Sequence, residues 1–165
     1  VGSSSSTGST FGTTTSGSTT STTSTTSSTS GTSSTSSTSG STTSPPVGNW
    51  YKVNSTVFNC STVYYGDYNN AWNVCGVSTA NDSCVVSFLS IPNAGIYNVI
   101  GGFPSVQSEC TVAAANSSTA FLGNSGTVTV SIVAGNKRRV VFNLPDSYDF
   151  LTSAQVSLSG DITTP

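Results

Sequence analysis

The sequence predicts an all-β protein in which one β-sandwich domain follows an extended tail rich in serine and threonine. Residues 1–44 are all Ser, Thr or Gly except Val1 and Phe11. After this segment, apolar residues alternate with polar ones at a period of two, and Gly, Pro or Asn separates the apolar runs. Such alternation is typical of short, half-buried strands. We therefore predict a tail over residues 1–46 and a β-sandwich over residues 47–165.

The tail has almost no apolar surface to offset the conformational entropy of ordering the chain, so on its own it should stay disordered. A Ser/Thr tract that ends in proline, as this one does at Pro45-Pro46, is typical of an O-glycosylated, mucin-like stalk. The alternative is a bare flexible linker. The candidate O-glycosylation sites are Thr13, Thr19, Thr22, Thr25, Ser33, Thr35, Thr38 and Thr42.

The first part of the body contains three β-rich runs, over residues 50–58, 84–89 and 96–100, bounded by Asn, Gly or Pro. Several short strands with such regular punctuation indicate a β-sandwich. Residues 110–115 form the one run that could instead be a short helix.

The second part of the body predicts a meander of three strands. Val or Ile alternates with Thr or Ser over residues 127–133, and the turn signal Gly135-Asn136 leads into a second alternating run, 139–144. These two runs predict a hairpin. Residues 145–147 then predict another turn before a last strand that contains 154–158.

Charged residues are scarce, with four Lys or Arg, six Asp or Glu, no His and a net charge of -2. Four cationic side chains are too few to form the basic surface that binds the phosphate backbone of nucleic acid. No apolar run approaches the about 20 residues that cross a bilayer. Since His is absent, the usual general base at neutral pH is missing. We predict no enzymatic activity, no catalytic residue, no cofactor, no metal site, no nucleic-acid partner and no membrane span.

Two polar segments allow a second interpretation. Asp146 and Asp149 could form a carboxylate pair that cleaves a glycoside, but their place beside Pro145 favours turn and cap residues. Residues 66–70 carry oxygen ligands at alternate positions and could contribute to a calcium site. They lack the twelve-residue loop of a recognised calcium motif, which favours a polar turn.

Four cysteines, Cys60, Cys75, Cys84 and Cys110, lie in the body without a Cys-x-x-Cys pair. An even number with this spacing favours two disulfides over a metal site. Of the three connectivities that four cysteines allow, we prefer Cys75 with Cys84 and Cys60 with Cys110. The alternative is four buried free thiols in a cytosolic domain.

Several features favour an extracellular or cell-surface location. Because the chain begins at Val1 and not at Met, we expect a mature product whose signal segment has been removed. Asn54, Asn59, Asn81 and Asn116 occupy Asn-x-Ser/Thr sequences and are candidate N-glycosylation sites. A body this rich in Asn, Ser and Thr would contain a similar number by chance. Covalent glycans are therefore expected chiefly from the context that the tail and cysteines indicate.

Aromatic residues gather between Trp50 and Trp72. Flat rings with polar edges can stack on sugars or on a partner's surface, although most of them could equally form core or cross-strand pairs. Tyr64, Tyr65 and Tyr68 are flanked by Gly and Asn, so we expect these three to be exposed. They are the candidates for contact with a sugar or a partner.

An N-terminal extension followed by a β-sandwich resembles the secreted filament subunits of prokaryotes, among them chaperone-usher pilins and the glycosylated threads of thermoacidophilic archaea. In those proteins the extension fills a groove in the neighbouring subunit. The resemblance implies an Ig-like or pilin-like sandwich and a head-to-tail polymer of this chain, joined through Val1, Phe11 and residues 13–26. We expect first a structural subunit of a glycosylated extracellular filament or cell-surface layer. The alternative is a carbohydrate-binding or adhesive module on a Ser/Thr linker.

Overall fold

The computed structural model describes residues 46–165, and every regular element in this part of the chain is a β-strand. The all-β sandwich prediction is confirmed. The candidate O-glycosylation sites and the segment 13–26 lie outside the described residues. The strands are β1 (Trp50–Val53), β2 (Thr56–Tyr68), β3 (Ala71–Ser78), β4 (Ser83–Phe88), β5 (Gly95–Val99), β6 (Glu109–Ala115), β7 (Ala120–Gly123), β8 (Thr127–Val133), β9 (Lys137–Asp149) and β10 (Gln155–Thr163).

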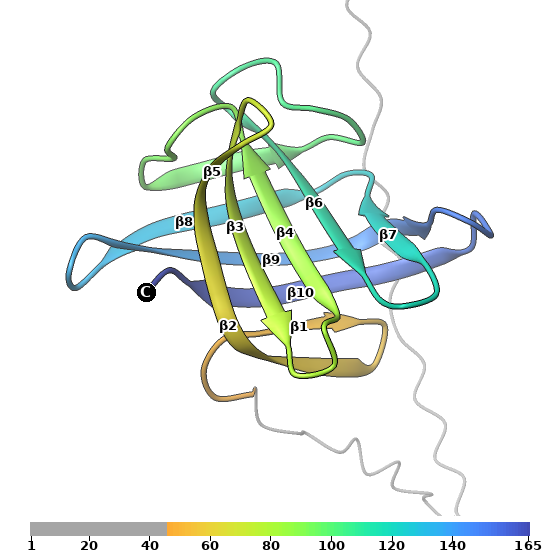
Figure 1. Cartoon of the computed structure of the whole chain (residues 1–165). Helices are drawn as coiled ribbons and strands as arrows, with labels where there is room; N and C mark the ends of the chain where they lie inside the picture. The colour runs from red at the N-terminus through yellow and green to blue at the C-terminus, as the bar shows by residue number, and fades with distance from the viewer. Residues whose placement is uncertain (1–45) are drawn as a thin grey trace, which may run out of the picture. The chain divides into compact units, whose positions relative to one another are not determined.

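The strands form two layers that belong to one continuous hydrogen-bonded sheet. Their order is β10-β1-β2-β3-β4-β6-β5-β8-β9-β7, and additional pairings of β10 with β9 and of β6 with β7 close the circuit. Figure 1 shows β2, β3, β4 and β6 crossing steeply in front of β8, β9 and β10. In crossed packings of this kind, strands pass from one layer to the other at bends or bulges.

Strand β2 makes one of these changes of layer. Its residues 56–59 pair with β1, whereas its residues 60–68 pair with β3. The register shifts between Cys60 and Thr62, which marks a bulge that bends the strand. As a result, the second half of β2 pairs with β3 on one side and with no strand of the described part of the chain on the other.

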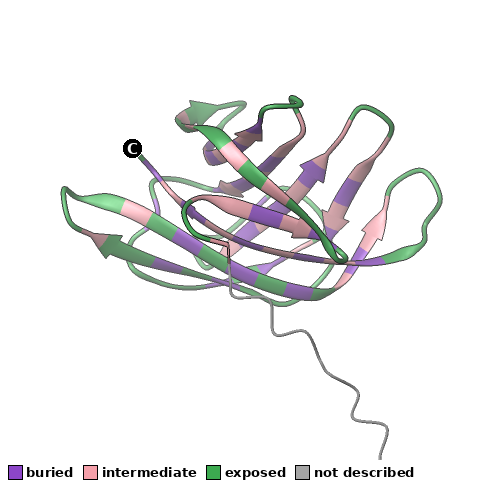
Figure 2. Ribbon diagram, turned by 90° about the horizontal axis from the view of Figure 1, so that it is seen from below, coloured by how far each residue is buried: buried purple, intermediate pink, exposed green. Residues whose placement is uncertain are grey.

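Buried residues alternate with more exposed ones along the strands, as the coloured bands in Figure 2 show, and the buried ones form the core between the two layers. Val86 of β4 and Val140 of β9 are completely buried. The rings of Phe88 and Tyr97 meet edge to face with 4.9 Å between their centroids, and the ring of Trp72 also packs against Phe88, with 6.4 Å between centroids. Full burial of such a side chain contributes about 1.5–3 kcal/mol, so this core accounts for much of the body's stability.

The hairpin expected over residues 127–144 is confirmed, since Val130 of β8 faces Val140 of β9. The alternative of a short helix over residues 110–115 is wrong, because these residues form most of strand β6. The single run 50–58 is two strands, β1 and β2, separated by a turn in which Asn54 has a φ of 53°.

The turn expected at residues 145–147 is also wrong, because β9 continues to Asp149. The ladder between β9 and β10 passes from the pair Leu144–Leu158 to the pair Ser147–Val156. Pro145 therefore lies in an irregular step of the ladder, where its missing N–H removes no paired hydrogen bond.

The two expected disulfide pairings are corrected by the structure, in which the four cysteines form no disulfide. Cys75 faces Val85, whereas the next residue along β3, Gly76, faces Cys84. Successive side chains of a strand point to opposite faces of the sheet. Cys75 and Cys84 are thus on neighbouring strands but on opposite faces, which a disulfide cannot bridge.

The second expected pair is too far apart along the sheet. Cys60 faces Ser78 at one end of β3, while Cys110 faces Phe88, which lies opposite Trp72 near the other end of β3. The stretch of β3 between these levels spans about 20 Å at roughly 3.3 Å per residue. A disulfide requires Cα atoms about 4.4–6.8 Å apart.

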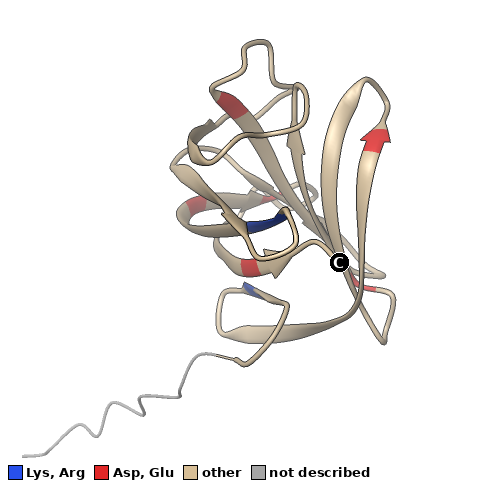
Figure 3. Cartoon of the chain, turned by 90° about the vertical axis from the view of Figure 1, so that its left-hand side faces the viewer, with Lys and Arg blue, Asp and Glu red and all other residues tan. Residues whose placement is uncertain are grey.

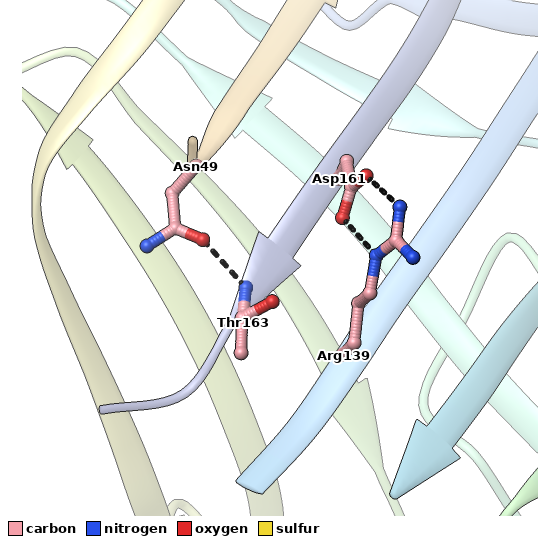
Figure 4. A network of polar contacts seen from close by, with 4 residues as sticks. All are labelled: Asn49, Arg139, Asp161 and Thr163. Carbon is pink, nitrogen blue, oxygen red and sulfur yellow. Dashed lines mark hydrogen bonds and ion pairs between the residues drawn. The ribbon is translucent and has the colours of Figure 1, made fainter. Parts of the chain in front are cut away.

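Charged side chains are few and scattered over the body (Figure 3). Within it, Arg139 of β9 makes a two-pronged ion pair with Asp161 of β10, in which Nε donates to Oδ1 over 2.8 Å (Figure 4). Beside this pair, Asn49 Oδ1 accepts a hydrogen bond of 2.7 Å from the backbone N–H of Thr163. These contacts fasten the start of the described chain and β9 to the last strand. The described residues contain no helix that is long and apolar enough to cross a membrane.

Candidate binding groove

The outer face of β2, β3 and β4 forms a shallow groove with a volume of about 580 Å³. The register places Tyr64 opposite Cys75 and Cys75 opposite Val85, so these three side chains share the outer face. The inner face of the same strands carries core residues such as Val74 and Val86. The groove therefore lies on the outer face of a layer whose inner face packs into the core.

The floor of the groove is low because the outward positions at its centre are small. Gly66 faces Asn73 and Asn73 faces Ser87 across the three strands. Serine, glycine and cysteine leave room above the sheet, while larger rings stand around them. Lining residues are Tyr64, Tyr65, Gly66, Asp67, Tyr68, Asn69, Ala71, Asn73, Cys75, Ser83, Val85, Ser87 and Phe103.

The side chain of Asn73 holds the hairpin of β2 and β3 from within the groove. Its Nδ2 donates to the carbonyls of Tyr68 and Ala71, over 3.1 and 2.9 Å, and its Oδ1 accepts from Ser87 Oγ over 2.6 Å. At the tip, Asn69 and Asn70 have φ values of 53° and 60°. Positive φ at both central residues is the requirement of the tightest hairpin turn, and Asn accepts it better than most residues.

Phe103 reaches the groove from the segment that joins β5 to β6. Figure 1 shows this connection and the β2–β3 hairpin at the same end of the body. The carboxylate of Glu109 accepts hydrogen bonds from the N–H of Ser105 over 2.9 Å, from its hydroxyl and from the N–H of Val106. The hydroxyl of Thr111 donates to the carbonyl of Gly102. The loop that carries Phe103 is thus tied to β6 on both sides of the ring.

Hydrogen bonds from Ser105, and a weaker one from Val106, lower the pKa of Glu109. The ionised carboxylate is therefore the form that holds this loop. Glu109 does not itself line the groove.

The groove is rich in exposed aromatic surface and poor in charge. Tyr64 is 61% exposed, Tyr68 72% and Phe103 80%. Asp67 is the only charged residue among those that line the groove in the described part of the chain. Large exposed apolar groups that are contiguous on a monomer usually mark an interaction site.

The structure brings together the three tyrosines that the sequence singled out, but they are not equivalent. Tyr64 and Tyr68 share the outer face, whereas Tyr65 faces Val74 and directs its ring toward Trp72, with 6.1 Å between centroids. Sequence reasoning missed Phe103. An aromatic residue between Gly-Gly and Pro is a signal of an exposed loop position and could have indicated it.

The other residues considered from the sequence lie elsewhere. Asp146 accepts hydrogen bonds from the side chains of Asn124 and Ser125, which lower its pKa. Asp149 accepts from the N–H groups of Leu151 and Thr152 in the turn that precedes β10, and its pKa is lowered as well. Both carboxylates are thus engaged in organising turns. No cluster of three or more metal-binding side chains occurs within residues 46–165.

The four candidate N-glycosylation sites are distributed over the body. Asn54 and Asn81 are exposed turn residues with positive φ, and Asn59 is exposed on β2. Asn116 is half-buried, and its Oδ1 accepts hydrogen bonds from the N–H groups of Ser118 and Thr119. Glycosylation at these positions stays a prediction.

Comparison of the chain with protein-family models, with curated proteins and with solved structures finds no match.

Proposed function

We propose that this protein is a glycan-binding module of the cell exterior, in which the groove on β2, β3 and β4 binds a neutral polysaccharide and the Ser/Thr-rich tail serves as a stalk. The observation that carries the proposal is that three largely exposed rings, Tyr64, Tyr68 and Phe103, line one groove, whose lining in the described part of the chain contains one charged residue. Pyranose rings present flat C–H faces and a rim of hydroxyl groups. Aromatic rings suit the faces, and amide and hydroxyl side chains suit the rims.

The polar groups of the groove favour binding of an uncharged ligand. Asn69 and Ser83 offer donors and acceptors near the rings. An anionic polymer would meet Asp67 and a chain with a net charge of -2. We propose binding without cleavage, since glycoside hydrolysis generally requires two carboxylates and the groove lining within residues 46–165 contributes one.

The expected affinity loss on removing one ring follows from its exposure. A tyrosine side chain has roughly 200 Å² of surface, of which Tyr64 exposes 61%. A sugar on one face would cover about half of that exposed area, or about 60 Å². At about 25 cal/mol per Å² this burial is worth about 1.5 kcal/mol, or roughly a tenfold change in affinity.

The test is electrophoresis of the full chain through gels that contain a soluble β-1,4-glucan, a xylan or a mannan. We expect at least one of the three to retard the wild-type protein, and Tyr64→Ala and Tyr68→Ala to restore most of its mobility. Phe150→Ala is the matched control, because Phe150 is 62% exposed but lies in the turn after β9 and does not line the groove. Absence of retardation by all three polymers, or an equal effect of Phe150→Ala, would refute the proposal.

A second candidate, a structural subunit of an extracellular filament, is favoured by the free edge of β2. Residues 60–68 pair only with β3 among the described strands, and such an edge can accept a strand from another chain. A contact between this edge and the tail of the next copy would not close, and so would propagate as a filament.

Sedimentation tests the filament candidate. The full chain should form large assemblies, while residues 47–165, which contain the whole described core, should stay folded and monomeric. If both sediment alike, the tail does not join the subunits.

A further inference from the structure

A second hollow, of about 460 Å³, lies beside the groove. It is lined by Asn69, Asn70, Ala71, Leu89, Phe103 and Pro104. Asn69, Ala71 and Phe103 also line the groove, so the two hollows are neighbours that share these residues. They meet at the tip of the β2–β3 hairpin.

We infer that the two hollows are successive subsites of one extended site, divided by Phe103, and that the ligand is a linear neutral oligosaccharide that passes across this ring. This inference rests on the proposed function, because it names the kind of glycan that the same groove takes. It excludes a single terminal sugar as the preferred ligand.

The size of the hollows supports an extended ligand. Cavities of about 300–1,000 Å³ hold drug-sized molecules, and each hollow reaches that range by itself. One sugar ring would occupy only part of either. A chain of several sugar units could fill both.

The position of Phe103 supports the division into two subsites. Its side chain lines both hollows and is 80% exposed, so most of its surface is available to a ligand. Its loop is fixed by the hydrogen bonds to Glu109 and Thr111 described above. The backbone on both sides of Phe103 is thus held in place, and the ring lies where the two hollows meet.

The second hollow, like the groove, is lined mainly by apolar and uncharged polar side chains. Leu89 and Pro104 provide apolar surface, while Asn69 and Asn70 provide amide groups. No charged residue lines this hollow in the described part of the chain. The same uncharged ligand can thus satisfy both.

The test measures affinity against ligand length by calorimetry with the full chain, using the biose and the hexaose of the three glycans tested above: cellobiose and cellohexaose, xylobiose and xylohexaose, and mannobiose and mannohexaose. We expect the hexaose of the bound series to bind at least about tenfold more tightly than its biose. Asn70→Gly and Leu89→Ala should weaken the hexaose severalfold and leave the biose unchanged. Glycine keeps the positive φ that position 70 requires. Tyr64→Ala should weaken both lengths.

The outcomes separate this inference from the proposed function. Equal affinities for biose and hexaose, both weakened by Tyr64→Ala, would reject the extended site and leave the glycan-binding function standing. Equal loss of both lengths in Asn70→Gly would reject the division into subsites. If no oligosaccharide of the three series binds, both proposals fail. Retained amide NMR dispersion of each variant shows that the loss is not due to unfolding.

Discussion

Replacement of Gly160 by alanine should strongly destabilise the body, because this glycine is covered by the ring of Phe142. Gly160 on β10 pairs with Phe142 on β9 and with Tyr51 on β1. A Cβ atom at this position would lie 2.5 Å from Cζ and 2.8 Å from Cε1 of Phe142, and 3.2 Å from the carbonyl oxygen of Trp50. Carbon atoms pack best about 3.5–4.0 Å apart. The ring would therefore have to move by about 1 Å within a filled core.

The size of the effect follows from that displacement. Forcing an extra methyl group into a packed core costs about 1–3 kcal/mol. The new methyl group cannot move away from the Phe142 ring, because the backbone carbonyl of Trp50 lies on its other flank. For a domain of this size, each kcal/mol lowers Tm by roughly 3–6 °C. We expect Gly160→Ala to lower Tm by about 5–15 °C.

The assay is thermal unfolding of the full chain followed by circular dichroism, with urea unfolding as a second measure. Gly102→Ala is the control, since a Cβ there would meet no atom of the described residues within 4 Å. The Tm of this variant should stay within about 1 °C of the wild-type value. Adding Phe142→Leu to Gly160→Ala should recover part of the loss. A change below about 1 °C in Gly160→Ala, or an equal drop in the control, would refute the assigned packing.

Three further predictions concern titration, thiols and a buried hydroxyl. The pKa of Glu109 is lowered, so its contribution to the Phe103 loop is complete above the ordinary Glu pKa of about 4.3 and is lost as pH falls through the lowered value. NMR shifts of the loop should follow that titration in wild type, and Glu109→Gln should abolish the pH dependence. When native protein is treated with a maleimide, half-buried Cys75 should be modified well before Cys84, which is fully buried and whose pKa is raised by that burial. Peptide mass mapping would measure the two rates. Equal rates would contradict the placement of the two cysteines on opposite faces of the sheet. Tyr51→Phe should leave stability unchanged or raise it by about 1 kcal/mol, because the Tyr51 hydroxyl is buried and has no hydrogen-bond partner among residues 46–165. A loss above about 1 kcal/mol in urea unfolding would show that this hydroxyl has a stabilising contact.

Part of the candidate site was visible in the sequence. Tyr64, Tyr65 and Tyr68 could be expected to be exposed because Gly and Asn surround them. Which of them face the groove depends on the pairing of β2 with β3 and so on the bulge at Cys60. Phe103 lies more than thirty residues from Tyr68, and only the packing of its loop against β6 brings the two together.

The cysteines show most clearly where sequence reasoning stops. Their even number favoured disulfides, and the spacing of Cys75 and Cys84 suggested a bridge across a polar loop. That loop is a tight connection between β3 and β4, and its register leaves the two side chains on opposite faces. A shift of one residue in register would have reversed this result, and spacing alone does not reveal such a shift.

The sequence by itself determined the all-β character of the body and the hairpin of β8 and β9, because the alternation of apolar and polar residues is a local property of the chain. It also set the composition of residues 1–44 apart from that of the body. Only the tertiary structure decided that β10 pairs with both β1 and β9, which closes the sheet, and that Phe103 joins the tyrosines of β2. These features depend on contacts between distant segments, whose free energy comes from burying a shared core and leaves no local pattern in the sequence.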